Sequence, residues 1–180
     1  MAVQTTLAVL LCPLAISCQT ADSQASREHF SASLDGANLS ITMRGQSGSA
    51  DLGSQLNAVR VNQSQVVFSA HTATGIFLVI EFIGPSPPQP GGGDCNNNGL
   101  EENLVWVAFD PSLHPINVTS ALIGSCTQMI DPGPGIQQDA KSLSVRYDCN
   151  AEHVRRILFF RKAAPQLGFT VQTAQMDSGQ

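Results

Sequence analysis

The sequence predicts an all-β protein, an antiparallel β-sandwich or jelly-roll-like fold in a single domain. Three observations support this class. Short apolar segments alternate with period two, Gly- and Pro-rich turns separate them, and nothing in the chain shows βαβ alternation. The length of 180 residues and the hydrophobic content of 42% are ordinary for one globular domain.

The first element expected is a hairpin over residues 30–43, with Asp35-Gly36 as its two-residue loop. Asp-Gly between alternating runs is a strong hairpin signal, because both loop residues must adopt positive φ. The expected cross-strand pairs are Leu34 with Ala37, Ala32 with Leu39, and Phe30 with Ile41. The other face then carries Ser31, Ser33, Asn38, Ser40 and Thr42. One face should meet the core and the other face water.

Residues 45–55 are polar and are predicted to form a loop. Residues 74–84 are apolar on both alternating faces except at Glu81, which predicts a central strand covered on both sides. Glu81 therefore either contacts a partner at the sheet edge or has a perturbed pKa, and we favour a structural role. The Pro- and Gly-rich segment 84–93 is predicted to be a connection. Five further strand-like runs follow it, at residues 103–109, 116–126, 142–148, 154–160 and 168–173, with a Pro/Gly-rich turn at 131–135.

The N-terminus is predicted to be an export signal over residues 1–17. It has an apolar stretch from Leu7 to Ile16 that is too short to span a bilayer. Residues 18–28 are predicted to be a flexible tether, residues 29–173 the β-domain and residues 174–180 a disordered tail. The expected location is therefore the periplasm, the cell envelope or the extracellular space.

Cys18 follows Ala15-Ile16-Ser17, a segment that resembles the bacterial lipobox, although Leu is the usual residue where this chain has Ala15. Ordinary cleavage after Ser17 explains the same residues equally well. Lipid on Cys18 is the only membrane attachment that the sequence predicts. The net charge of −5 gives no basic surface for nucleic acid. The expected partner is an unidentified envelope or extracellular ligand.

The segment from Asp94 contains part of a calcium-loop pattern. Asp94, Asn96 and Asn98 occupy ligand positions 1, 3 and 5, and Gly99 follows at position 6. Position 12, which requires a bidentate acidic group, is Val105. Glu101 and Glu102 offer charge only through a different geometry. We favour a polar turn over a calcium site and expect no other cofactor.

Some of these residues also belong to a second pattern. It runs Cys95…Gly99-x-Glu101-x-x-Leu104-x-Trp106, then Asp110, then Ser120-x-Leu122-x-x-Ser125-Cys126. This run resembles a group of uncharacterised exported bacterial proteins in which Cys-x-x-Gly-x-Glu-x-x-Leu-x-Trp leads to a closing Ser-Cys. The chain differs by one extra residue between Cys95 and Gly99, and that residue creates the calcium-like spacing.

The resemblance covers the middle third of the chain and implies a Cys95–Cys126 disulfide. The strand pattern agrees, because the two cysteines bracket two strand-like runs joined by a turn at Asp110. Trp106 is then expected to anchor the core. The partners of Cys149 and Cys18 stay open.

No complete catalytic motif is present. The segment GQSGS ends in Ser49 where a nucleophile elbow needs Gly, and no helix is expected after it. Our first hypothesis is a non-enzymatic, envelope-associated binding or structural module. The alternatives are a hydrolase that uses a carboxylate pair and a calcium-stabilised interaction module.

Overall fold

The computed structural model describes residues 29–89, 95 and 99–176, and it is built almost entirely of strands. The predicted signal peptide, the tether and Cys18 lie outside the described residues. The strands are β1 (Ser31–Asp35), β2 (Asn38–Met43), β3 (Gln46–Asp51), β4 (Gln63–Thr72), β5 (Gly75–Pro85), β6 (Leu100–Phe109), β7 (Pro115–Ser125), β8 (Ile130–Asp131), β9 (Ile136–Gln138), β10 (Ser142–Cys149), β11 (Val154–Arg161) and β12 (Phe169–Gln175). Three short 3-10 turns, η1 (Gly53–Gln55), η2 (Asn150–Glu152) and η3 (Pro165–Leu167), complete the described elements.

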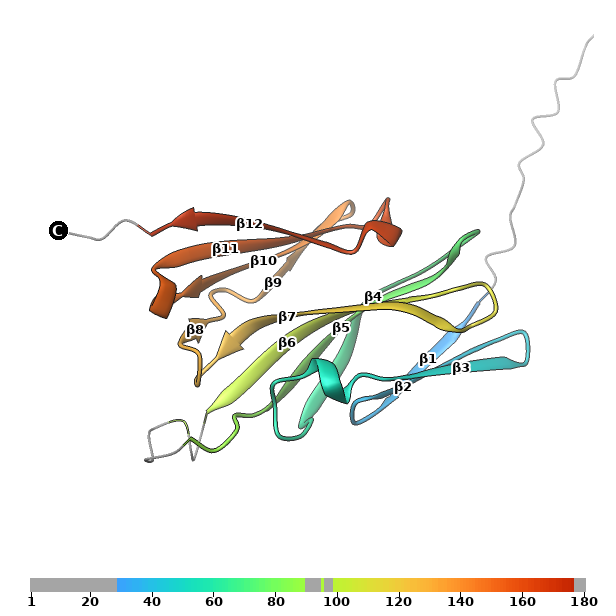
Figure 1. Cartoon of the computed structure of the whole chain (residues 1–180). Helices are drawn as coiled ribbons and strands as arrows, with labels where there is room; N and C mark the ends of the chain where they lie inside the picture. The colour runs from blue at the N-terminus through green and yellow to red at the C-terminus, as the bar shows by residue number, and fades with distance from the viewer. Residues whose placement is uncertain (1–28, 90–94, 96–98, 177–180) are drawn as a thin grey trace, which may run out of the picture.

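The strands form two antiparallel sheets that pack together, so the all-β sandwich prediction is confirmed. The small sheet has the order β1-β2-β3, and the nine-stranded sheet has the order β12-β11-β10-β8-β7-β6-β5-β4, with β9 paired to β10. In Figure 1, β4–β7 form a middle layer, with β9–β12 on one side and β1–β3 on the other. The nine-stranded sheet therefore supplies two of the three layers.

The nine-stranded sheet folds back on itself at the two-residue strand β8. Phe68 on β4 meets Phe160 on β11 edge to face, with ring centroids 4.9 Å apart, although these strands are far apart in the sheet order. Trp106 on β6 is buried in the same core, and its Nε1 donates to the Pro165 carbonyl at 3.0 Å. This core joins β4–β7 to β10–β12.

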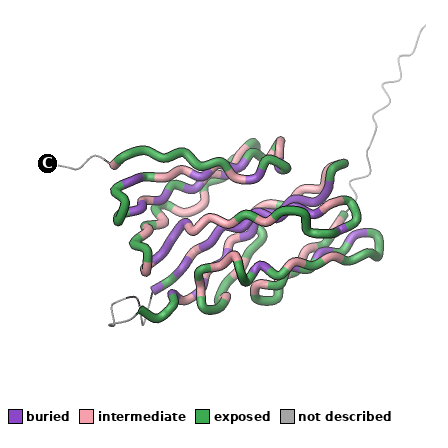
Figure 2. The backbone as a smooth tube through the Cα atoms, viewed as in Figure 1, coloured by how far each residue is buried: buried purple, intermediate pink, exposed green. Residues whose placement is uncertain are grey.

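A second core lies between the small sheet and the other face of β5 and β6. Leu39 and Ile41 from β2 pack there with Ile80 and Val105. Strand β5 is therefore buried on both faces over residues 75–80, as its continuous apolar sequence predicts. Figure 2 shows buried residues concentrated along the middle layer, whereas β12 is exposed along most of its length.

The first hairpin forms with a different register from the one predicted. Its loop is Gly36-Ala37, so Leu34 pairs with Leu39 and Asp35 with Asn38. Gly36 has φ of +57°, whereas Ala37 is not left-handed, which fits a turn that needs glycine at its first position only. The pairing slips by two residues. A two-residue slip preserves the faces, so the serines still point away from the core.

The predicted loop over residues 45–55 is also wrong, because residues 46–51 form strand β3. Gln, Ser, Gly and Asp have low strand propensity, but β3 pairs with β2 along its whole length. At Gly48 an added Cβ would lie 2.0 Å from the Leu113 carbonyl oxygen. The turn between β6 and β7 thus packs directly against the backbone of β3, and this tertiary contact overrides the local preference.

The C-terminal boundary lies slightly later than predicted. Strand β12 continues to Gln175, and residues 177–180 of the predicted tail lie outside the described residues. In the part of the chain that the structure describes, no helix has the length and apolar character needed to cross a membrane.

Candidate functional site

The candidate site lies at the start of β6, where two glutamates follow each other. Glu101 and Glu102 point to opposite faces of the sheet because consecutive strand residues alternate. Glu101 faces the side covered by residues 57–61 and is completely buried, whereas Glu102 is half-buried on the opposite side. A bulge in the pairing with β7 follows directly, between Glu102 and Asn103. One strand end therefore supplies two separate acidic environments.

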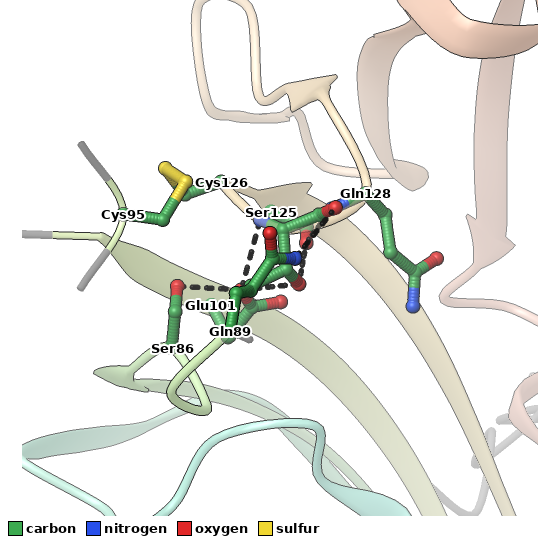
Figure 3. The surroundings of a disulfide bond; sticks show 8 residues. Ser86, Gln89, Cys95, Glu101, Ser125, Cys126 and Gln128 are labelled. Carbon is green, nitrogen blue, oxygen red and sulfur yellow. Dashed lines mark hydrogen bonds between the residues drawn. A yellow bond between two sulfur atoms is a disulfide. The ribbon is translucent and has the colours of Figure 1, made fainter. Parts of the chain in front are cut away.

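The Cys95–Cys126 disulfide fixes this end of the sandwich, as the resemblance implies. The Cα atoms are 5.6 Å apart, and the bridge closes a separation of 31 residues. Backbone hydrogen bonds flank it, because Gly99 N donates to the Cys95 carbonyl and Cys126 N to the Leu100 carbonyl. Figure 3 shows the bridge beside Glu101 and Ser125. A structural disulfide indicates an oxidising, non-cytoplasmic environment.

Glu101 is held by hydroxyl groups from both segments that the disulfide joins. Its Oε1 accepts a hydrogen bond from Ser86 Oγ at 2.6 Å and another from Thr127 Oγ1 at 3.1 Å. The Thr127 amide lies 3.5 Å from the same oxygen. Ser86 is placed by its own amide, which donates to the Gly99 carbonyl. The carboxyl group thus ties the chain after β5 to the chain after β7.

Two buried polar atoms beside this network have no hydrogen-bond partner among the described residues. They are Glu101 Oε2 and Asn103 Nδ2, which belong to residues on the same face of β6. Asn103 Oδ1 accepts from the Asn57 amide at 3.4 Å. Buried polar groups are normally paired, so this polar pocket is unusual in leaving two hydrogen-bonding atoms without a partner among the described residues.

On the face of β6 that points away from Glu101, the Glu102 side chain contacts Glu81 of β5. In the β5–β6 ladder Glu102 lies opposite Ile83 and Glu81 opposite Leu104, so the two glutamates are diagonal neighbours on one face. Burial, followed by the hydrogen bond and the repulsion between the two side chains, raises the pKa of Glu102 from 4.5 to about 7. Gln65 on β4, directly opposite Glu81, donates its side-chain amide to Glu81 Oε2.

Two open concavities flank this carboxylate pair. One, of about 180 Å³, is lined by Gln65 and Glu81 on the β4 side. The other, of about 250 Å³, is lined by Glu102, Gly124 and Pro132 on the β7 side. Ile83 borders both. The pair is therefore accessible from two sides, whereas the Glu101 pocket is closed.

Glu102 can hold a proton near neutral pH, because burial and the neighbouring Glu81 carboxyl group both oppose its ionisation. Glycoside hydrolysis has a different geometric requirement. Its two carboxyl groups stand about 5 to 9.5 Å apart, with room for a sugar bond or a water between them. Glu81 and Glu102 instead lie close enough to raise the pKa of Glu102 by direct interaction. The arrangement is better suited to binding a proton or a cationic group.

Of the residues named for a calcium site, the structure describes only Glu101 and Glu102. Glu101 and Glu102 occupy opposite faces of β6, while Asp94, Asn96 and Asn98 lie outside the described residues. Within residues 29–89, 95 and 99–176, no three His, Cys, Asp or Glu side chains are grouped closely enough to hold a metal ion. Cys149 is a buried free thiol, and burial raises its pKa.

The sequence indicated Glu81 and Glu102 separately but not as a pair. Glu81 was conspicuous as the one charge in an apolar strand, and Glu102 belonged to the calcium alternative. Their contact depends on the register between β5 and β6, which no local signal specifies. No sequence pattern indicated Gln65 as a site residue.

No protein-family model, no curated protein and no solved structure matches this chain. The resemblance to exported bacterial proteins therefore stays a prediction based on the quoted residues.

Proposed function

We propose that this chain is an exported binding module of the bacterial cell envelope that recognises a positively charged group through Glu81 and Glu102. The disulfide supports export because such bonds persist in oxidising compartments. The apolar N-terminal segment, with small residues before Cys18, supports it independently. Periplasm, envelope and extracellular space all fit, and a lipid on Cys18 would add a membrane anchor.

The observation that carries the proposal is the contact between two half-buried carboxyl groups at an accessible surface. A proton on Glu102 stabilises this contact below about neutral pH. An ammonium or guanidinium group can replace that proton, since it donates several hydrogen bonds and compensates both negative charges. Gln65 holds one carboxylate in place, so the acceptors are already oriented.

A second candidate, a carboxylate-dependent hydrolase, is favoured by one feature. A pKa of about 7 at Glu102 lies where a general acid works best at neutral pH. The direct contact between the two carboxyl groups argues against glycoside cleavage but not against every hydrolysis. Turnover of a common glycan or ester substrate that disappears in both E81Q and E102Q would establish this alternative.

The binding proposal is tested by NMR titration of the mature protein with an octalysine peptide at pH 8, with octaglutamate as the control. We expect saturable shifts at Gln65, Glu81 and Glu102 with octalysine only. The E81Q/E102Q double variant should bind at least about tenfold more weakly, a loss of about 1.4 kcal/mol. D148N, which changes a partly exposed carboxylate on β10 that pairs with Arg155, is the matched control and should bind normally.

The proton should compete with the peptide. Lowering the pH to 5.5 protonates Glu102 and is expected to weaken octalysine binding in the wild type but to leave the double variant unchanged. Equal affinity of wild type and double variant at pH 8 would contradict the proposal.

A further inference from the structure

The outer face of the small sheet carries a regular array of hydroxyl groups, separate from the carboxylate pair. Register places Ser31 beside Thr42 and Thr42 beside Ser47, and a second row contains Ser33, Ser40 and Ser49. We call these six residues the hydroxyl face. All six are exposed, while the alternate residues Leu39 and Ile41 are fully buried in the core beneath.

Fold stability does not explain this composition. Serine has a low strand propensity, and exposed faces of edge strands usually carry long charged side chains that prevent aggregation. Strands β1–β3 contain no Lys or Arg. None of the six hydroxyl groups has a hydrogen-bond partner among the described residues. In contrast, the exposed Arg155 on β11 makes two hydrogen bonds to Asp148.

The array has a defined spacing because it is built on paired strands. Neighbouring strands lie about 4.8 Å apart, and alternate residues along a strand about 6.7 Å apart. Each hydroxyl both donates and accepts hydrogen bonds, and a short side chain loses little entropy when it is fixed. A third row of Asp35, Asn38 and Asp51 continues the lattice at one end.

A concavity of about 490 Å³ borders the hydroxyl face at the edge of β3. It is lined by Ser40, Ser47 and Ser49 together with Ser112 and His114 from the turn before β7. This turn is rigid. Asp110 Oδ1 accepts the amides of Ser112 at 2.8 Å and His114 at 2.9 Å, and Leu113 is held at φ of +65° in the core.

We infer that the hydroxyl face and this concavity bind a neutral glycan chain. Successive sugar rings present hydroxyl groups without charge, which matches two rows of uncharged donors and acceptors. The turn carrying Ser112 and His114 supplies a wall against one ring. Asp35 and Asp51 at the end of the lattice accept hydrogen bonds from sugar hydroxyls and repel an acidic glycan. This face lies on the side of β5 and β6 opposite Glu81 and Glu102, so the inference does not depend on the cation-binding proposal.

The test is an NMR titration of the mature protein with neutral hexasaccharides (cellohexaose, maltohexaose and mannohexaose), with hyaluronan hexasaccharide as the acidic control. We expect at least one neutral hexasaccharide to shift the amides of β2, β3 and residues 112–114, and hyaluronan to shift none of them. The S40K/S49K double variant should lose at least about tenfold in affinity.

T173K is the matched control because Thr173 is an exposed hydroxyl residue on a strand, on the far side of the molecule. T173K and E81Q/E102Q should bind the hexasaccharide normally. Amide spectra establish that each variant is folded, and S33K/S40K replaces S40K/S49K if the latter unfolds. Absence of shifts in β2 and β3 with all three neutral hexasaccharides, or unchanged affinity in the lysine variant, would overturn the inference.

Discussion

Glu101 and Glu102 are adjacent on β6, yet one lies in a closed hydroxyl pocket and the other against a second carboxyl group. The Glu101 side chain connects three chain segments through hydrogen bonds that neutral Ser86 and Thr127 donate. Glu102 instead meets Glu81, and its environment opposes its charge. The comparison shows that alternation along a single strand can separate an acid held by hydrogen bonds from an acid whose charge is opposed by its surroundings. Four predictions below test this difference, from the largest expected effect to the smallest.

Removing the disulfide should have the largest effect on stability, and it should disturb the surroundings of Glu101 and not those of Glu102. In the C95S/C126S variant, the loss of loop constraint should lower the free energy of unfolding by about 3 to 4 kcal/mol. Urea denaturation under oxidising conditions measures it. The Glu102 pKa should stay near its wild-type value, because Glu81 and Gln65 lie outside the disulfide-closed loop. A large drop in that pKa would show that the two environments are not independent.

Replacing Glu101 should be the next largest change. E101A leaves the buried Ser86 hydroxyl without its acceptor, removes one of the two hydrogen-bond partners of the Thr127 hydroxyl and opens a small cavity, so we expect a loss of about 2 to 4 kcal/mol. Chemical denaturation at pH 5 and pH 8 should give similar losses. The Ser86 hydroxyl donates to Glu101 Oε1, so an S86A variant should lose part of the same energy. Additive losses in E101A and S86A would argue against a shared hydrogen bond.

Replacing Glu102 should stabilise the fold at high pH, whereas replacing Glu101 destabilises it. The folded-state pKa of about 7 lies above the ordinary value of 4.5, so the folded protein holds an extra proton between these values. That contribution to stability is complete below about pH 4.5 and is lost as the pH rises through 7. E102Q is neutral throughout and should therefore be more stable than wild type at pH 8, by about 1 to 2 kcal/mol after allowance for solvent screening. Thermal unfolding between pH 4.5 and 8.5 measures it.

Replacing Glu81 should change the pKa of Glu102 and leave the fold intact. E81Q removes the repulsion that contributes to the raised pKa of Glu102, so that pKa should fall toward 4.5 while burial keeps it above that value. Carbon-detected NMR titration of the glutamate carboxyl groups reports the shift. An unchanged Glu102 midpoint would mean that burial alone sets it.

Patterns within single segments predicted the fold class well. The unbroken apolar sequence of β5 specified a strand buried on both faces, and the alternation in β1 and β2 separated core from solvent correctly even though the turn shifted the register. Strand β3 was missed because its Ser- and Gly-rich sequence gives no local signal and depends on the contact between Gly48 and Leu113.

The site was only partly predictable for the same reason. The Cys95–Cys126 pair follows a spacing pattern that the sequence displays, and the structure contains it. The contact between Glu81 and Glu102 arises from the β5–β6 register, and the burial of Glu101 from chain segments 15 and 26 residues away, which supply Ser86 and Thr127. Such long-range pairings become visible only once the strands are placed.

The most direct test of the division between the two glutamates is a comparison of E101A and E102A by urea unfolding at pH 5 and pH 8. Glu101 supports the fold, so E101A should be less stable than wild type at both pH values. The charged form of Glu102 is disfavoured by burial and by Glu81, so E102A should be more stable than wild type at pH 8 and lose that advantage at pH 5. If both variants were destabilised equally at pH 8, the contrast between the two faces of β6 would be contradicted.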